Sequence, residues 1–394
     1  MTTLAHLALF MLALPATVMS SYLLLLTLLS RAAPPASRSS RRLRFDVIVP
    51  AHDEAAIIAR VVASLRALDW PARRFRVLVV ADNCTDSTAA RARAAGADVL
   101  ERHDASRRGK GYALEFAFQA SQARAWADAI VVVDADSEVS TNLLDAFATR
   151  IEGGAAAIQA HHGVLNAHAS WRTRLMAIAL GAFHRVRSRA RERLGLSCGI
   201  RGNGWCVTNS LLRQVPYRAF SLAEDIEYGI DLGLAGLRVR YADEAQVNAM
   251  MVSAEQAART QRRRWEDGRL QLIRSRTWPL LMASRGAGGR VCLDLALDLL
   301  VLPLSYLAAA IGVLIAAAGL ALPWSPSLAI WLWVGFGCAL GLLVHVLRGW
   351  QLSGVGWRGL VDLLRAPGFV LWKLLLMVRQ HDSDKWVRTR REPS

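Results

Sequence analysis

Long apolar stretches stand near both ends of the chain. Residues 4–29 carry no formal charge apart from a possible proton on His6. At about 1.5 Å rise per residue they are long enough to cross a hydrocarbon core roughly 30 Å thick, and they predict one spanning helix. A cleaved signal peptide is the alternative interpretation. No Lys or Arg precedes the apolar run, whereas five arginines follow it within residues 31–44, which favours an uncleaved anchor whose C-terminal side is cytoplasmic.

Apolar length returns in the last third of the chain. Residues 291–322 contain a full span, although Asp294 and Asp298 lie near its start, and residues 328–347 form another. The link between the two stretches is too short for anything but a hairpin, so the two predicted helices go out and come back.

A further apolar segment covers residues 360–378. It contains Asp362, Arg365, Pro367 and Lys373, and this composition favours a helix that lies in the membrane interface over one that spans it. The positive-inside rule then keeps the basic C-terminal tail in the cytoplasm.

Between these segments, short β-branched runs alternate with helical patterns. The runs at 45–51 and 75–82 are each followed by a helix-patterned segment, and the run at 129–136 comes after another. Strands that alternate with helices predict an α/β fold with a doubly wound, mostly parallel sheet. The predicted organisation is a transmembrane anchor (1–30), a basic linker (31–44), a cytoplasmic α/β domain (45–290), a transmembrane hairpin (291–347), and an interfacial helix with a basic tail (348–394).

Carboxylates follow each of the predicted strands. Asp53 comes after the first, Asp82 ends the second, and Asp134 and Asp136 close the third. Ligands of such sheets bind at the carboxyl ends of the strands, so these side chains are expected at one edge. Asp134 and Asp136 are two residues apart and can face the same side. Paired carboxylates there suit a hard divalent cation that also binds phosphate oxygens.

Further candidate site residues lie in two helical segments in the second half of the α/β region and in one earlier loop that contains a lysine. Glu224 and Asp225 open a predicted helix that ends near Gly236; the helix dipole alone also explains an acidic pair in a first turn. The segment "QRRRW" (261–265) is also helical in composition, and a membrane-facing or nucleic-acid-facing basic helix is its alternative reading. Lys110 sits in "RGKGY", where it either meets a base or a phosphate or is simply solvated.

The formal net charge of +16 raises a different class of function, a membrane-tethered protein that binds nucleic acid or anionic lipid. Much of this charge lies in residues 31–44, 184–193 and the C-terminal tail, where a cytoplasmic membrane surface accounts for it. No RNA-binding motif, P-loop or dinucleotide fingerprint is present in the sequence, so no nucleic-acid partner is expected.

Five scattered cysteines without a CxxC pair predict a reducing compartment and no disulfide framework.

Taken in order, the segments VPAHDE, VVADNCTDST, RGKGY, VVVDADSE, LAEDIEYGIDL and QRRRW, followed by apolar helices, resemble the membrane-bound family 2 glycosyltransferases. That branch includes cellulose synthases, hyaluronan synthases and ceramide glucosyltransferases. The resemblance covers about residues 45–270. One departure is Ala223, which stands where the family usually has Thr, and little consequence is expected because that residue does not ionise.

The resemblance implies a GT-A-like domain that uses a nucleotide-diphospho-sugar, usually UDP-linked, with inversion at the anomeric carbon and Mg²⁺ or Mn²⁺ as cofactor. The resemblance implies that Asp53 and Asp82 contact the uridine, that Lys110 approaches the donor, and that Asp134 contacts the sugar and diphosphate. It also implies that Asp136 binds the metal together with Asp134 and that Asp225 is the general base. The residues implied to close over donor and acceptor are Glu224, Gln261, Arg264 and Trp265.

These roles agree with the chemistry of the residues. A sugar hydroxyl is a poor nucleophile, so a carboxylate should accept its proton, and a cation with an arginine stabilises the charge that develops on the leaving diphosphate. The acceptor is less well defined. About three spans are sparse for a synthase that threads a polymer through a channel, so a lipid or lipid-linked acceptor is favoured, with processive polysaccharide synthesis as the alternative.

Overall fold

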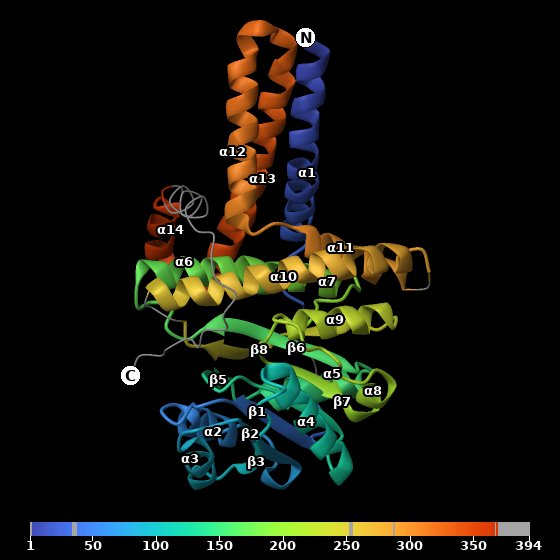
Figure 1. The fold of residues 1–394 in the computed structure, drawn as a ribbon, viewed down its shortest axis with the longest axis vertical. Helices are drawn as coiled ribbons and strands as arrows, with labels where there is room; N and C mark the ends of the chain where they lie inside the picture. Colours follow the sequence, from blue (N-terminus) through green and yellow to red (C-terminus); the bar gives the residue numbers. More distant parts are fainter. Residues whose placement is uncertain (1, 34–37, 252–254, 287, 367, 369–394) are drawn as a thin grey trace. The chain divides into compact units, whose positions relative to one another are not determined.

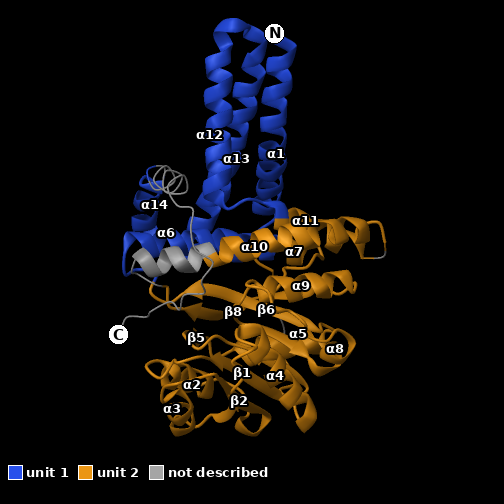
Figure 2. Cartoon of the chain, in the orientation of Figure 1, with its two compact units in different colours: residues 1–31, 167–190, 300–388 blue, residues 32–166, 191–299, 389–394 orange. Residues whose placement is uncertain are grey.

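The computed structural model describes residues 2–33, 38–251, 255–286, 288–366 and 368, and in the stretch 255–263 it describes the backbone only. The described chain divides into two compact units (Figure 2). One, here called the α/β unit, comprises residues 32–166 and 191–299. The other, the helical unit, comprises residues 1–31, 167–190 and 300–366 with residue 368.

The described part of the α/β unit is built on an eight-stranded sheet with the order β3-β2-β1-β4-β7-β6-β8-β5 (Figure 1). Its strands are β1 (Phe45–Ala51), β2 (Phe75–Asp82), β3 (Asp98–Arg102), β4 (Ala129–Val132), β5 (Ser137–Val139), β6 (Ala157–Val164), β7 (Trp205–Thr208) and β8 (Val239–Ala249). The first four strands in chain order run parallel to one another, which confirms the predicted α/β class. β7 is antiparallel to both β4 and β6, and β5 is antiparallel to β8, so the whole sheet is mixed.

Helices cover the sheet and extend beyond it. They are α2 (Ile58–Arg66), the 3₁₀ turn η1 (Ala72–Arg74), α3 (Thr88–Ala94), α4 (Lys110–Arg124), α5 (Leu143–Glu152), α7 (Arg187–Arg193, whose first four residues belong to the helical unit), α8 (Asn209–Gln214), α9 (Glu224–Leu234), α10 (Glu255–Ala283) and α11 (Gly289–Leu300). Gly236, with φ of 77°, follows the end of α9 in the left-handed conformation expected of a helix terminator.

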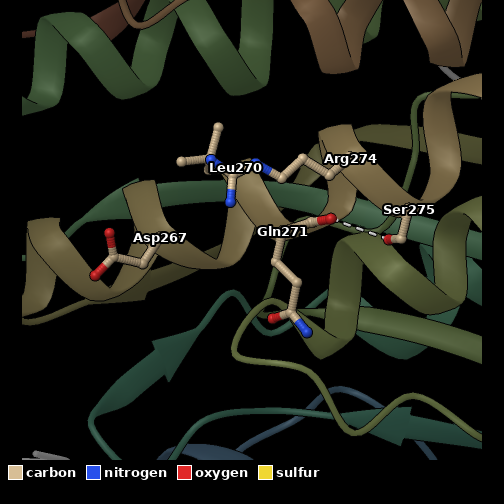
Figure 3. Close-up of a pocket in the computed structure, with 5 residues that line it drawn as sticks. All are labelled: Asp267, Leu270, Gln271, Arg274 and Ser275. Carbon is tan, nitrogen blue, oxygen red and sulfur yellow. Dashed lines mark hydrogen bonds between the residues drawn. The ribbon is translucent and has the colours of Figure 1, made fainter. Parts of the chain in front are cut away.

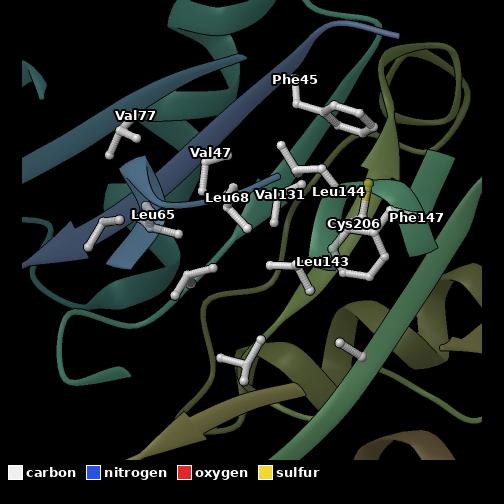
Figure 4. Packing of buried hydrophobic residues seen from close by; sticks show 14 of the residues in the cluster. Phe45, Val47, Leu65, Leu68, Val77, Val131, Leu143, Leu144, Phe147 and Cys206 are labelled. Carbon is white, nitrogen blue, oxygen red and sulfur yellow. The ribbon is translucent and has the colours of Figure 1, made fainter. Parts of the chain in front are cut away.

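Both faces of the parallel strands are buried, which explains why their sequences are almost continuously apolar. Successive residues alternate between two cores, because side chains along a strand point to opposite faces. Val47 and Val131 pack on one face with Leu65 of α2 and Phe147 of α5 (Figure 4). Ile48, Leu78 and Ile130 pack on the other face with Leu114 and Phe118 of α4. The strands are thereby fixed from both sides, and their carboxyl ends are left to carry the site.

The helical unit contains α1 (Thr2–Leu28), α6 (Trp171–Leu180), the π-helix η2 (Gly181–Val186), α12 (Leu304–Ala321), the 3₁₀ turns η3 (Leu322–Trp324) and η4 (Pro326–Leu328), α13 (Ala329–Ser353) and α14 (Gly356–Leu363). Among the described residues, three helical segments are long and apolar enough to cross a membrane, by length and composition: Thr2–Leu28, Leu304–Trp324 and Pro326–Ser353.

Small residues bring the helices of this unit together. A Cβ at Gly181 of η2 would lie 2.8 Å from the carbonyl oxygen of Gly349 on α13, so the two backbones approach as closely as glycine permits. Close approach at small residues is the usual way in which apolar helices associate. The stretch 167–190 therefore groups with the apolar helices, although the sequence pattern placed it inside the domain predicted for residues 45–290.

The predicted span at 291–322 is divided in the structure. α11 ends at Leu300 and α12 begins at Leu304, directly after Pro303, which lacks the N–H that a continuous helix would need. α11 packs in the α/β unit with α9 and α10. Its Asp294 and Asp298 each lie within 3 Å of the guanidinium of Arg191, so both charges are paired inside the α/β unit. The candidate span starts at residue 304 instead.

The segment predicted to lie in the interface, 360–378, is described only at its start. α14 ends at Leu363, and Asp362 accepts from Arg174 of α6 at 2.6 Å and pairs with Arg365 at 3.2 Å. Residues 367 and 369–378 lie outside the described residues, so the prediction for this segment stays a prediction.

Candidate active site at the carboxyl edge of the sheet

The register of the parallel strands places the predicted acidic residues at one edge. Ala51 of β1 pairs with Ala81 of β2, and Ile48 of β1 pairs with Val132 of β4. Asp53, Asp82 and Asp134 therefore leave neighbouring strands at the same end of the sheet, as the sequence pattern predicted.

Asp53 closes the loop between β1 and β2. Its backbone has φ of 53°, a left-handed conformation that aspartate tolerates better than most residues. One carboxylate oxygen accepts the backbone N–H of Thr85 at 2.7 Å and that of Asp86 at 3.2 Å. In this structure the Asp53 side chain thus holds the loop after β2 against the loop after β1.

Three side chains of this loop pair, Asp53, Cys84 and Asp86, have ligand atoms within 4.8 Å of one another. Both carboxylates accept backbone N–H groups, Asp86 from Thr88 at 2.8 Å and from Ala55 at 3.1 Å. Burial raises the pKa of the Cys84 thiol, which disfavours the thiolate that a metal would require. The chemistry of this group fits contact between the two loops better than metal binding.

Asp82 ends β2 and is buried beside an arginine that sequence reasoning missed. Arg102 ends β3, directly opposite Asp82 in the register, and its Nη1 lies 2.6 Å from the Asp82 Oδ1. The Arg102 guanidinium also lies over the ring of Tyr112, 5.9 Å from its centroid, and Tyr112 stacks on Phe220 at 4.5 Å. The signal for Arg102 was its position at the end of the next parallel strand.

Lys110 joins the acidic residues at the centre of the site. It is the first residue of α4, and its Nζ lies 2.6 Å from the Asp134 Oδ1 and 3.5 Å from the Glu224 Oε1. It also donates to the carbonyl oxygen of Gly202 at 2.8 Å. Burial by itself would lower the pKa of Lys110, but Asp134 and Glu224 outweigh it and hold the pKa above its usual value. Lys110 is therefore a fixed positive charge rather than a solvated one.

Asp225 lies beside this cluster in the first turn of α9. Burial, reinforced by the adjacent Glu224 carboxylate and opposed by Lys110, raises the pKa of Asp225 to about 7. A Cβ at Gly202 would lie 3.4 Å from the Asp225 Oδ2. Gly202 has φ of 82°, so it both adopts the left-handed turn and leaves the space beside this oxygen open. A carboxyl group that titrates near neutrality is suited to exchange a proton with a substrate.

Asp136 and Asp134 are the residues whose chemistry best fits a divalent cation. The Asp134 side chain is 32% exposed despite its contact with Lys110, and the Asp136 Oδ1 accepts from the Ser137 hydroxyl at 3.3 Å. Both offer hard oxygen ligands at an accessible edge, as Mg²⁺ and Mn²⁺ prefer. Such an ion would share Asp134 with Lys110.

The segment "QRRRW" forms part of α10. The side chain of Gln261 lies outside the described residues. Arg264 is exposed, and Trp265 is 38% exposed. The structure thus leaves the ring of Trp265 accessible on the α/β unit, and the part that Gln261 and Arg264 take in the site stays a prediction.

α10 is fastened to the helix that carries Asp225. A Cβ at Gly268 would lie 3.1 Å from the Cβ of Ala223, the residue that precedes α9. A threonine at 223 would add two heavy atoms beside this contact, so the departure at Ala223 affects the packing of α10 rather than ionisation. Further along, Arg276 pairs with Glu227 at 2.9 Å and with Asp231 at 3.1 Å.

An open pocket lies along α10 just after Trp265 (Figure 3). It is lined by Asp267, Leu270, Gln271, Arg274 and Ser275. Its walls combine one apolar side chain with charged and amide groups, and it does not include the carboxylates around Lys110.

The loop before β7 also reaches the site and was not predicted to do so. Arg201 to Gly204 contribute the carbonyl that Lys110 binds, and the Arg201 carbonyl accepts from His162 at 3.2 Å. Burial lowers the pKa of His162, although Asp134 opposes this effect, and the neutral ring is thereby favoured. The closely spaced glycines of "RGNGWC" (201–206) were the sequence signal for this loop. Only the tertiary structure shows that the loop lies beside the site.

Comparison with known proteins gives a family for this region. A family model described as glycosyltransferase like family 2 matches residues 43–268. Beta-monoglucosyldiacylglycerol synthase from Synechocystis sp. is 29% identical over 237 residues, which are 57% of this chain and 47% of that protein. Probable glucomannan 4-beta-mannosyltransferase 1 from Arabidopsis thaliana is 23% identical over 248 residues, 60% of this chain and 45% of that protein. The chain thus spans about half the length of these curated relatives.

A solved structure is similar over most of the chain. It is the mannosyltransferase PcManGT from Pyrobaculum calidifontis in complex with GDP-Man and Mn²⁺, with a TM-score of 0.54 and 19% sequence identity. The alignment covers 86% of this chain and 98% of that one. The likeness confirms the predicted GT-A-like fold.

The pairing of Arg276 with Glu227 and Asp231 predicts a pH-dependent contribution to stability. Arg276→Met should lower the free energy of unfolding at pH 7 by about 1–3 kcal/mol, because it leaves two half-buried carboxylates without their cation. Burial tends to raise the pKa of Glu227, but Ser221 and Arg276 outweigh it and keep the pKa low. This stabilisation is present above the unfolded pKa of glutamate and is lost as the pH falls through the folded value.

Thermal unfolding of the detergent-solubilised chain at pH 7 and pH 4 measures this effect. The deficit of the variant should shrink at the lower pH, whereas Arg274→Met, an exposed change on the same helix, should have little effect at either. An equal deficit at both pH values would contradict the ion-pair assignment.

Proposed function

Because this chain belongs to the glycosyltransferase family 2, we propose that it is an inverting enzyme that transfers a sugar from a nucleotide-diphospho-sugar to a lipid or lipid-linked acceptor at a membrane. The observation that carries the proposal is the cluster at the carboxyl edge of the sheet. There Lys110 lies 2.6 Å from Asp134 and 3.5 Å from Glu224, beside an Asp225 whose pKa is raised to about 7.

The donor is assigned to the edge formed by β1, β2 and β4. Asp82 with Arg102 offers both a hydrogen-bond acceptor and a donor, which is what the polar edge of a pyrimidine such as uracil requires. Asp53 shapes the loop beside it. UDP-linked sugars are therefore the proposed donors.

The diphosphate is assigned to the neighbourhood of Lys110 and the aspartates at 134 and 136. When bound there, Mg²⁺ or Mn²⁺ held by Asp136 and Asp134 would neutralise the charge that develops on the leaving diphosphate. Lys110 supplies a fixed positive charge at the same place, and Arg264 is assigned a similar role. The exposed ring of Trp265 offers an apolar face against which a sugar can stack.

Asp225 is assigned the part of general base. Its ionised carboxylate accepts the proton of the acceptor hydroxyl while that oxygen attacks the anomeric carbon and the bond to the diphosphate breaks. Attack from the side opposite the leaving group inverts the configuration in one step. The raised pKa makes Asp225 a better proton acceptor than an ordinary aspartate, while it remains partly ionised at neutral pH. Gly202 leaves room for the hydroxyl beside the Asp225 Oδ2.

A membrane lipid is the proposed acceptor for two reasons. Among the described residues, three helical segments are long and apolar enough to cross a membrane. The relative from Synechocystis sp. is named as a synthase of a glucosylated diacylglycerol. Basic residues at 31–44, next to α1, suit placement of the α/β unit on the cytoplasmic side of the inner membrane. The glucomannan mannosyltransferase among the relatives makes a polymer the alternative product.

Incubation of the detergent-purified chain with a panel of UDP-sugars, membrane lipid extract and Mg²⁺ or Mn²⁺ tests the function. The expected result is label from one sugar in a lipid-sized glycoconjugate, and loss of labelling when the metal is chelated. A labelled polymer would favour processive synthesis over single transfer. No transfer from any of the UDP-sugars, together with salt-sensitive binding to nucleic acid, would overturn the proposal in favour of a polyanion-binding protein.

The base assignment predicts that Asp225→Asn keeps donor binding but lowers the turnover number by about 10²–10⁴-fold, because an amide cannot accept the proton. Asp231→Asn, the same change six residues further along α9, is the matched control and should retain turnover. Donor binding is measured by titration calorimetry and turnover by release of UDP. Turnover of Asp225→Asn close to that of the unaltered chain would contradict the assignment.

A further inference from the structure

The loop before β7 is held to the acidic turn after β4 by one buried side chain. Asn203 is fully buried. Its Oδ1 accepts the backbone N–H of Asp134 at 3.0 Å, and its Nδ2 donates to the Ser137 hydroxyl at 2.7 Å. That hydroxyl donates in turn to the Asp136 Oδ1 at 3.3 Å. A single amide group therefore contacts the start and the end of the turn that carries Asp134 and Asp136.

The backbone that carries Asn203 is itself fixed from two directions. Gln159 of β6 donates to the Asn203 carbonyl at 2.7 Å and accepts the Arg201 N–H at 2.8 Å. Gly204 follows in a left-handed conformation, where a Cβ would lie 2.6 Å from the side chain of Val247. Gly204 thus lies where a larger side chain would not fit, and the loop is held against β6 and β8.

The Arg201 side chain anchors the other end of the loop. Its guanidinium donates to the Cys198 carbonyl at 2.9 Å and to the Asp298 Oδ2 at 3.0 Å. Asp298 also pairs with Arg191 at 2.7 Å, and the Arg191 side chain is completely buried. Buried charges of this kind hold their geometry tightly, because any separation exposes an uncompensated charge to a low dielectric.

We propose that Asn203 is a positioning residue that sets the separation and direction of the Asp134 and Asp136 carboxylates for a diphosphate and its divalent cation. The inference rests on the proposed function. Two carboxylates on one short turn repel each other. Lys110 pairs with the Asp134 carboxylate, and the backbone of the turn must also be held in place before a cation arrives. Asn203 does this with one acceptor and one donor and adds no charge to the site. Groups that orient the ligands of a metal govern its affinity even though they do not touch it.

The test compares two buried asparagines of the α/β unit. Asn203→Ala removes both contacts to the acidic turn. Asn209→Ala is the matched control, because Asn209 is also buried and its Nδ2 donates to the Ala127 carbonyl at the opposite end of β4. Both variants lose a buried amide, Asn203→Ala with two hydrogen bonds and Asn209→Ala with one, and thermal unfolding of the full chain without ligand measures the stability that each loses.

Calorimetric titration with UDP, in the presence of Mn²⁺ and in its absence, separates positioning from folding. Asn203→Ala should bind UDP with Mn²⁺ roughly 10–100-fold more weakly, with a much smaller change when Mn²⁺ is absent, whereas Asn209→Ala should bind as the unaltered chain does. In the ligand-free protein, hydrogen exchange at the Asp134 amide should become faster in Asn203→Ala and stay unchanged in Asn209→Ala.

If Asn203→Ala fails to fold, Ser137→Ala serves instead. It removes only the outer link to Asp136 and should weaken Mn²⁺-dependent UDP binding in the same direction by a smaller factor. Unaltered binding in a folded Asn203→Ala or Ser137→Ala variant, beside normal binding by the unaltered chain, would overturn the positioning role and leave the proposed function intact. Failure of the unaltered chain itself to bind UDP or GDP with any divalent cation would overturn both.

Discussion

The acidic edge of this sheet depends on one partly buried lysine. Lys110 contacts Asp134 and Glu224, which come from different parts of the chain and would otherwise repel each other. Taking such charges out of water is tolerated only when they are paired and hydrogen-bonded. The Gly202 carbonyl completes the coordination of the lysine. The start of α4, the turn after β4, the start of α9 and the loop before β7 are thus drawn to a common point.

The same pairing separates the properties of neighbouring carboxyl groups. Asp134 is in direct contact with the Lys110 cation, whereas burial and Glu224 raise the pKa of Asp225 to about 7. Sites that place similar carboxyl groups in different environments typically use one carboxylate to provide charge and another to exchange a proton. In a chain whose net charge is +16, this acidic edge is a local exception, and it suits a bound cation rather than a polyanion.

The sequence predicted the parts of the site that follow parallel strands. Apolar runs that end in aspartates identified Asp53, Asp82 and Asp134, because parallel strands bring their carboxyl ends to one edge. Arg102 was missed because its role depends on pairing between β2 and β3. Asn203 and Gln159 were missed because β7 and β6 enter the sheet in an order that local patterns do not specify.

The start of the candidate span within residues 291–322 depends on a long-range contact in a similar way. Residues 291–300 are apolar enough to extend a span in sequence. Their two aspartates pair with Arg191, which is about a hundred residues away in the chain, so the helix belongs to the α/β unit. Hydropathy registers the charges but cannot identify their partner. The roles of Gln261 and Arg264 rest on family resemblance alone.

The pH dependence of kcat/KM, which reports ionisation in the free enzyme, tests the central claim that Glu224 and Lys110 tune Asp225. As the proposed base, Asp225 must be ionised, so activity should fall as the pH drops through about 7. Glu224→Gln removes a negative neighbour of Asp225 and leaves Lys110 paired with one carboxylate fewer, and both changes favour the Asp225 carboxylate. The acid limb of that variant should therefore move to lower pH. A limb that stays in place or moves to higher pH would contradict the account.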